Sequence, residues 1–298
     1  MLVHLNGRLV EESRARLSVF DRGFLYGDGI FESMRAIGGV VFRQSRHLER
    51  LGRSADGIGL ALPIPASGFA AAVRELLDRN RLPDARIRIS VTRGEGRPGN
   101  YVEAQGPPSV VIAAAGFEGL DPALYQSGVR VAIGRRRQIP PDALDPAIKS
   151  ISRLSSVLAR REAREAGAFE AILLDGEGNL TEGTVSNLFL VIGGRLLTSP
   201  APSGGLPGIT RAAVAELARA FSIGFSEERL PAGLLETADE VFLTNTTWEI
   251  LPVVLIDGRP VGAGVPGPVA RHLLARYREL VHLECGAGAA GRDEEAWR

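Results

Sequence analysis

The sequence predicts an α/β protein (α+β in its first half) with two domains, and three observations lead to this prediction. In the first half, apolar runs meet at turn dipeptides and are followed by two helical patterns. Residues 116–128 are rich in turn formers, as an interdomain linker is. In the second half, strand patterns alternate with helical ones. We therefore predict a small N-terminal domain over residues 1–117, a linker over 118–128, a large domain over 129–285 and a disordered tail over 286–298.

The first half contains two predicted hairpins. Asn6-Gly7 and Gly38-Gly39 each separate two apolar runs, and such dipeptides favour tight two-residue turns. Two helical patterns follow, and we expect Ser67 to be the N-cap of the second helix. The expected strands cover residues 3–5, 8–10, 30–37, 40–43, 87–92 and 110–115, and the expected helices cover 47–58 and 67–79.

The second half reads as strands alternating with helices. A loop that carries Lys149 joins the first strand to an Arg/Glu/Ala-rich helix, and a Pro/Gly-rich loop over 199–208 precedes the next helix. The expected strands cover residues 129–133, 170–174, 187–192, 195–197, 240–244 and 252–256, and the expected helices cover 153–166, 209–221 and 269–283.

Composition narrows the class of protein. The 35 basic and 35 acidic side chains cancel, which argues against a nucleic-acid binder or a protein of the membrane surface. No apolar stretch approaches the roughly 20 residues that a membrane helix needs. The single cysteine, Cys285, and an N-terminus unlike a signal peptide predict a cytoplasmic protein. The four histidines are scattered without ligand spacing, so we expect no metal site.

The most informative feature of the composition is the number of lysines. Lys149 is the only lysine, and every other cationic side chain is an arginine. Arginine can replace lysine in ion pairs and phosphate clamps, but guanidinium stays protonated and cannot form a Schiff base. On composition alone, Lys149 is as compatible with a chance surface position as with a chemical role, so its neighbourhood must decide.

Two segments in the second half of the chain suggest a chemical role for the lysine. Lys149 stands among apolar residues just before a helix, where partial burial would lower the pKa of an amine and favour its neutral form. Glu182 follows a turn over 176–179, and a carboxylate can keep a pyridine nitrogen protonated so that the ring accepts electrons. Taken alone, Glu182 is more typical of a surface turn.

Three further segments could hold a phosphate. Residues 205–211 form a Gly-rich loop that opens a helix, although most such loops are only turns and caps. Residues 242–248 end a strand with several hydroxyl groups. Arg50 lies at the start of a helix and offers a guanidinium, while His47 is expected to fix that helix rather than to take part in chemistry.

Together these segments make the chain resemble the fold-type IV pyridoxal-phosphate (PLP) enzymes, over about residues 3–283. This family includes branched-chain aminotransferase, D-amino-acid aminotransferase and aminodeoxychorismate lyase. The matching motifs are Tyr26-Gly27-Asp28-Gly29-Ile30-Phe31-Glu32, His47-Leu48-Glu49-Arg50-Leu51, residues 148–159, Thr181-Glu182-Gly183 with Ser186-Asn187-Leu188-Phe189, Leu206-Pro207-Gly208-Ile209-Thr210-Arg211, and Thr244-Asn245-Thr246-Thr247 with Leu251-Pro252-Val253.

The resemblance implies a role for each matching position. It implies a large domain with a mixed, barrel-like sheet flanked by helices, PLP as cofactor, and a homodimer. Lys149 matches the lysine that bonds the cofactor and acts as catalytic base. The matching cofactor-binding positions are Glu182 at the pyridine nitrogen, Leu206 on a face of the ring, and Arg50, Ile209, Thr210 and Thr246 at the phosphate. The matching substrate-binding positions are Phe31, Arg35, Arg88, Arg97, Thr246 and Thr247.

The resemblance also implies the reaction, transfer of an amino group between an amino acid and a 2-oxo acid through a Schiff base on Lys149. Phe31 and Arg35 are similar to the branched-chain enzymes, whereas residues 148–150 and 169–173 are closer to the D-amino-acid enzymes. Leu154 stands where branched-chain enzymes commonly have Tyr, which puts that assignment in doubt.

Several alternatives stay open from the sequence. Arg153-Leu154 is similar to the lyase motif, so release of pyruvate by β-elimination is the alternative reaction. A PLP-binding protein without catalysis is a third possibility. Arg88, Arg93 and Arg97 suit substrate carboxylates and structural roles about equally. A dinucleotide-binding fold is set aside because the pattern over 94–99 opens no helix and contains Pro98.

Overall fold

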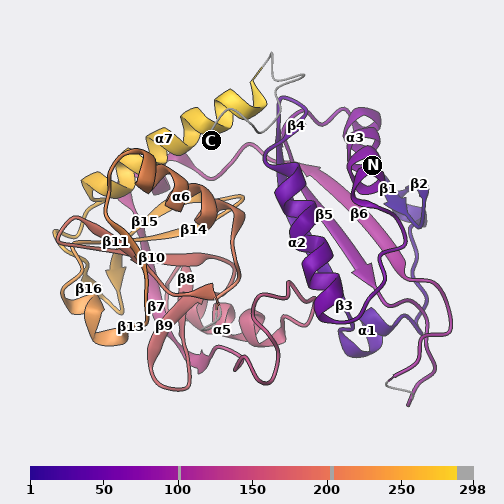
Figure 1. Ribbon diagram of the computed structural model, residues 1–298, viewed down its shortest axis with the longest axis horizontal. Coiled ribbons are helices and arrows are strands. Elements are labelled where there is room, and N and C mark those ends of the chain that lie inside the picture. The colour runs from indigo at the N-terminus through magenta and orange to yellow at the C-terminus, as the bar shows by residue number, and fades with distance from the viewer. Residues whose placement is uncertain (100–101, 202–204, 287–298) are drawn as a thin grey trace. The chain divides into compact units, whose positions relative to one another are not determined.

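The computed structural model of the protein describes residues 1–99, 102–201 and 205–286 (Figure 1). Its chain divides into two compact units. Unit 1 comprises Met1–Glu118, Ile148–Ser152 and the chain from Glu279 onward, and unit 2 comprises Gly119–Ala147 and Arg153–Arg278. Apart from Gly286, the predicted tail over 286–298 lies outside the described residues.

Unit 1 contains a six-stranded sheet in the order β2-β1-β6-β5-β3-β4. Both predicted hairpins are present in it. Asn6 and Gly7 have φ values of 49° and 84°, the left-handed conformation that a tight hairpin turn requires, and Gly38 and Gly39 have 58° and 83°. The strands are β1 (Leu2–Leu5), β2 (Arg8–Glu11), β3 (Gly29–Ile37), β4 (Val40–Val41), β5 (Ala85–Thr92) and β6 (Ser109–Gly116).

Two helices, α2 (Gln44–Gly57) and α3 (Ala66–Asn80), pack on the sheet of unit 1 and complete its core. In Figure 1, α2 runs in front of the strands β3 and β5. The prediction that Ser67 caps α3 is wrong, because the N-cap is Pro65. The extended Pro65 carbonyl accepts bonds from the N–H groups of Gly68 and Phe69, so Ser67 already lies in the first turn.

Strand β3 separates a buried face from a more open one. Ile30, Glu32 and Met34 point into the core beneath the helices and are fully buried. Phe31 and Arg35 alternate with them on the opposite face and are half-buried. The strand therefore presents two predicted substrate residues on one side and an ionisable Glu32 on the other.

Unit 2 contains a ten-stranded sheet, of which six strands close into a barrel. The ring runs β10-β14-β15-β7-β8-β9 and closes because β9 also pairs with β10, where Glu182 lies opposite Asn187. The predicted barrel-like sheet is thereby confirmed. Its strands are β7 (Val129–Arg137), β8 (Glu170–Leu174), β9 (Asn179–Gly183), β10 (Asn187–Ile192), β14 (Glu240–Asn245) and β15 (Glu249–Ile256), extended by β11 (Arg195–Thr198), β12 (Phe225–Glu227), β13 (Leu230–Pro231) and β16 (Arg259–Pro260).

Helices flank this barrel, as predicted. The helix α5 (Leu154–Glu165) connects the parallel strands β7 and β8, and its small residues Ala159 and Ala163 pack closely against them. The other long helices are α6 (Ile209–Ala220) and α7 (Pro268–Cys285). Short elements that the patterns did not predict are α1 (Arg22–Tyr26), α4 (Pro122–Ser127, within the predicted linker) and the 3-10 helices η1 (Glu12–Arg14) and η3 (Ala232–Glu236).

The segment Ile148–Ser152 belongs to unit 1 although unit 2 precedes and follows it in the chain. Ser150 forms an antiparallel bridge with Ile30 of β3, so the segment acts as a short additional partner of that strand. This bridge brings Lys149 to unit 1.

Candidate active site

Lys149 is held in unit 1 through its main chain. The Lys149 carbonyl accepts a hydrogen bond from the Phe31 N–H (2.9 Å), and its own N–H donates to the Ser54 hydroxyl (3.1 Å). The Ile151 N–H donates to the Gly29 carbonyl (3.1 Å). Anchored on both sides, the half-buried side chain places its Nζ 4.8 Å from the centre of the Phe31 ring.

Phe31 also meets the first of the predicted substrate arginines. The Arg88 guanidinium lies 3.9 Å from the centre of the Phe31 ring, and its Nε donates to the Ser90 hydroxyl (3.1 Å). Arg35 packs instead over the Phe117 ring at 5.5 Å. Unit 1 therefore brings Lys149, Phe31 and Arg88 together, while Arg35 contacts a different aromatic ring.

Arg50 belongs to a fully buried ionic cluster with Glu32 and His47. Its Nε and Nη2 donate to the two Glu32 carboxylate oxygens at 2.9 and 2.7 Å, and the His47 Nδ1 lies 3.1 Å from Glu32 Oε1. Burial opposes ionisation of Glu32, but the charge of Arg50 and the hydrogen bonds bring its pKa well below the ordinary value. Burial lowers the pKa of His47, against the opposing influence of Glu32.

Glu32 was not predicted as a partner of Arg50, although the sequence carries a signal for it. Glu32 is the one ionisable residue in the inward-facing alternation of β3. A charge in such a position is retained only when it is paired, so the pattern required a buried cation nearby. His47 meets the expectation stated for it, because it contacts Glu32 beside Arg50.

Arg93 and Arg97 differ clearly in their surroundings. Arg93 donates to the Asp28 carboxylate (2.8 Å) and to the carbonyls of Ile58 and Gly59 (2.7 and 2.9 Å), where α2 has just ended. These bonds give Arg93 a structural role. Arg97 is exposed in the loop after β5 and makes no hydrogen bond or ion pair with the described residues.

Glu182 lies in unit 2, buried on the barrel strand β9 and not in a surface turn. Its Oε2 accepts hydrogen bonds from the Leu206 N–H (2.8 Å) and from the Asn187 amide (3.3 Å). Its Oε1 accepts from the Gln138 amide (3.1 Å). Donors on three different segments therefore fix the position of the carboxylate.

Helix α6 begins next to this carboxylate. The Asn187 amide also donates to the Leu206 carbonyl (2.8 Å), and this bond fixes the loop that leads into the helix. The N-cap, Gly208, makes no side-chain cap, and the first four N–H groups of a helix have no partner within it. The Ile209 and Thr210 N–H groups are thus available for an anion at the positive end of the helix dipole.

The turn at Thr246-Thr247 joins β14 to β15 in the same unit. Asn245 Oδ1 accepts hydrogen bonds from the N–H groups of Thr247 (2.9 Å) and Trp248 (2.7 Å) and from the Thr247 hydroxyl (3.0 Å). Both threonines are half-buried. The turn is therefore a rigid polar corner.

The predicted site residues thus fall into two sets. Unit 1 carries an amine beside an aromatic ring and an arginine, and unit 2 carries a fixed carboxylate, a helix terminus suited to an anion, and a polar turn. Within the described part of the chain, no three His, Cys, Asp or Glu side chains are grouped to hold a metal ion. Of the helices described, none combines the length and apolarity needed to cross a membrane.

Comparison with known proteins agrees with these features. The sequence model of the amino-transferase class IV family matches residues 29–256. A Methanocaldococcus jannaschii protein, provisionally named a branched-chain-amino-acid aminotransferase, is 41% identical over 94% of this chain and 96% of its own length. D-alanine aminotransferase from Bacillus licheniformis is 33% identical over 95% of this chain and 98% of its own length. The crystal structure of T.th. branched-chain amino acid aminotransferase with pyridoxamine 5'-phosphate is 32% identical, with a TM-score of 0.90 over 99% of this chain and 97% of that one.

Proposed function

The chain belongs to the class IV aminotransferases, and from this premise we propose that it transfers amino groups between an amino acid and a 2-oxo acid, with PLP as cofactor and Lys149 as the residue that bonds it. The observation that carries the proposal is the placement of the only lysine, which is held at its main chain on both sides and half-buried beside Phe31. A solvated surface lysine would not need such anchoring.

Two features of unit 2 support PLP as the cofactor. The buried Glu182 carboxylate suits a protonated pyridine nitrogen, because three N–H donors hold it in one position. The uncapped start of α6 suits a phosphate monoester. Leu206 belongs to this set because its N–H bonds Glu182, and Thr246 is expected to add a hydroxyl donor to the phosphate.

Arg50 is also part of the proposed phosphate set. Its charge is shared with Glu32 through two short hydrogen bonds, so we expect it to act on the phosphate as a fixed, partly neutralised cation. Its rigid position is the useful property here, because a long side chain that is already ordered loses little entropy when a ligand binds.

When bound, PLP supplies an aldehyde and a ring that withdraws electrons from the carbon to be deprotonated. Lys149 would hold the cofactor through Nζ, and its neutral amine would move the α-proton of the substrate. Glu182 would serve as the counter-charge of the protonated pyridine nitrogen, and the Thr246-Thr247 turn and Arg88 would orient the substrate carboxylate.

The decisive experiment replaces the only side-chain amine. Lys149→Arg keeps the positive charge but removes the nucleophile, so transamination is expected to fall by at least about a thousandfold, with loss of the absorption band that marks the lysine-bound cofactor. Arg53→Lys, an exposed change on α2, serves as control and should leave both properties unchanged. Substantial turnover by Lys149→Arg would contradict the proposal.

For the substrate, we propose a branched-chain L-amino acid. Phe31 supports this choice, because an aromatic ring without a hydroxyl, packed against the Lys149 amine and Arg88, makes an apolar wall. The test adds L-leucine and D-alanine separately to the holoenzyme and follows the cofactor band. Conversion by L-leucine alone is expected, and conversion by D-alanine alone would assign the D-amino-acid reaction. Pyruvate released from aminodeoxychorismate without an amino acceptor would instead indicate the lyase reaction.

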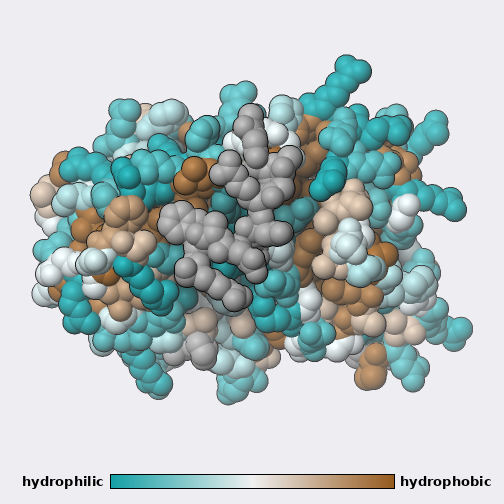
Figure 2. Space-filling view, turned by 45° about the horizontal axis from the view of Figure 1, so that its top comes forward, coloured by the Kyte–Doolittle hydropathy of each residue, from teal (hydrophilic) through white to brown (hydrophobic). Residues whose placement is uncertain are grey.

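We also propose that the enzyme is a cytoplasmic homodimer. Four large hydrophobic side chains are exposed within residues 17–24 of unit 1, and we refer to them as the hydrophobic segment: Leu17, Val19, Phe20 and Phe24. On the face that Figure 2 shows, hydrophobic residues are exposed among hydrophilic ones. Exposed apolar side chains that cluster in this way are typical of a protein interface.

A further inference from the structure

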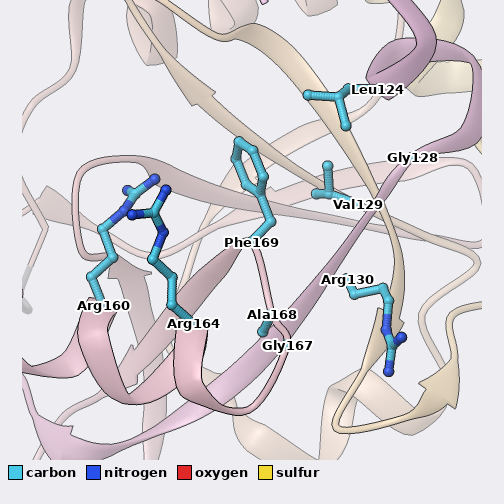
Figure 3. A pocket seen from close by; sticks show the side chains of 9 residues that line it. All are labelled: Leu124, Gly128, Val129, Arg130, Arg160, Arg164, Gly167, Ala168 and Phe169. Atoms are coloured by element: carbon cyan, nitrogen blue, oxygen red, sulfur yellow. The ribbon is translucent and has the colours of Figure 1, made fainter. Parts of the chain in front are cut away.

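Unit 2 has a pocket whose lining includes none of the residues proposed above for cofactor or substrate. Its volume is about 410 Å³, which is within the range of small-molecule sites. The lining comes from α4, the start of β7, the second half of α5 and the loop that leads into β8 (Figure 3). The lining residues are Leu124, Gly128, Val129, Arg130, Arg160, Arg164, Gly167, Ala168 and Phe169.

Three arginines and no carboxylate line the pocket, and the charge of one of them, Arg160, is paired with the buried Glu170 behind the lining. In Figure 3 the guanidinium groups of Arg160 and Arg164 lie next to each other on one side of the Phe169 ring, whereas that of Arg130 points away. Arg160 and Arg164 are one turn apart on α5, and like charges at this spacing repel. An anion between them would remove this repulsion.

Arg160 and Arg164 differ in how firmly the structure holds their side chains. Arg160 is fixed, because its Nη1 donates to the buried Glu170 carboxylate (3.1 Å) and its guanidinium lies 4.9 Å from the centre of the Trp248 ring. Arg164 is exposed, and its side chain makes no hydrogen bond or ion pair with any residue that the structure describes. One rigid and one adaptable guanidinium form a clamp that suits a carboxylate.

The opposite side of the pocket is apolar. Leu124 and Phe169 are half-buried and Val129 is buried, so all three present hydrocarbon rather than polar atoms to a ligand. The Phe169 ring is held in place by an edge-on contact with the Trp248 ring, at 5.0 Å between centres. The pocket therefore combines a cationic end with a preformed apolar wall.

From these observations we propose a second ligand site, for a small carboxylate with a branched or aromatic hydrocarbon chain. The carboxylate binds between Arg160 and Arg164, and the hydrocarbon packs against Leu124, Val129 and Phe169. The site is independent of the proposed cofactor chemistry, because neither Lys149 nor Glu182 contributes to it.

The test uses Trp248 as a reporter, because its ring contacts two side chains of the lining, Phe169 and Arg160. Trp297→Phe removes the chain's only other tryptophan, and the holoenzyme of this variant is titrated with 4-methylpentanoate, which has neither an amino nor an oxo group. A saturable change in Trp248 emission is expected, and Arg164→Gln in the same background should weaken this binding about tenfold or more. The cofactor band, read in parallel, reports any binding at the proposed active site.

Two matched controls make the result specific. Arg161→Gln removes one charge from the same helix, but Arg161 is exposed and pairs with Glu165 away from the pocket, so the titration should not change. The uncharged 4-methylpentanamide should not bind. If Arg164→Gln titrates like its parent, or if the only response is in the cofactor band, the second site does not exist, and the proposed transamination is unaffected by either outcome.

Discussion

Glu32 is a carboxylate in the middle of a buried strand, and its two cationic neighbours make that position tolerable. Glu32 and His47 are fully buried, and Arg50 is 3% exposed, so the cluster has little solvent to stabilise a lone charge. Removing one partner of such a buried ion pair leaves the other partner buried without a counter-charge. Glu32 therefore acts at a distance from the chemistry, by fixing the helix that carries Arg50.

Replacing Glu32 should reveal both the energy and the pH dependence of this cluster. Glu32→Gln is expected to lower the free energy of unfolding by about 3–5 kcal/mol at neutral pH, because it leaves Arg50 buried without a counter-charge. Glu12→Gln, at an exposed position, should change it by less than about 0.5 kcal/mol. Urea unfolding measures both.

The pH dependence has a definite sign. The folded-state pKa of His47 is lowered, so stability is lost as the pH falls through the ordinary histidine value of 6.5, where the unfolded chain takes up the proton. The lowered pKa of Glu32 adds a further loss below 4.5. In Glu32→Gln the second loss should disappear, and a variant that keeps it would show that other carboxylates cause the acid limb.

At this scale the sequence indicated candidate residues but not the contacts that hold them in place. Lys149 was identifiable because it is the only lysine, and Glu182 because of the motif around it. The Gln138 amide that bonds Glu182 comes from the end of β7, and no local pattern links these two positions. Arg93 could not be classified before its bonds to Asp28 and to the end of α2 were known.

At the scale of elements, the entry into helix α6 depends on the smallness of Gly208. A Cβ at this position would lie 2.0 Å from Asn187 Oδ1, although the backbone φ of −69° is ordinary. Asn187 would have to move, and it bonds both the Leu206 carbonyl and Glu182. The glycine is thus required by a side chain on a neighbouring strand.

Gly208→Ala is expected to weaken PLP binding about tenfold or more, since displacing Asn187 disturbs the carboxylate and the helix terminus together. Titration of the apoenzyme with PLP measures the effect. Gly176→Ala, where an added Cβ meets nothing within 4 Å, is the matched control. Equal affinity in the two variants would mean that the Asn187 contacts do not support the cofactor site.

The long elements were predictable because their patterns are local. The hairpins followed from Asn6-Gly7 and Gly38-Gly39, and the major helices from their periodicity. The start of α3 was misplaced because Ser67 is a good N-cap residue by type, while the preceding Pro65 in fact ends the extended chain. Short strands such as β9 depend on tertiary pairing, so their own sequence does not mark them.

At the scale of the whole molecule, the hydrophobic segment is the feature that bears on assembly. Phe24 is 77% exposed and Val19 is 66% exposed, which is costly for a protein that stays monomeric. Val19→Ser with Phe24→Ser is expected to convert the proposed dimer to a monomer, as measured by light scattering after size-exclusion chromatography. Val265→Ser, an equally exposed change in unit 2, should leave the dimer intact. A wild-type monomer would contradict the proposed assembly.

The bridge between Ile30 and Ser150 has a consequence for how this protein can be divided. Five residues of the later chain provide a bridging partner for a strand that lies much earlier in the sequence, so a cut after Glu118 leaves the amino-terminal fragment without Lys149. Recombination between relatives would have to exchange the strand and the lysine segment together. Transferring strand β3 alone would leave it without its bridging partner, and transferring the lysine segment alone would leave Lys149 without the strand that holds it.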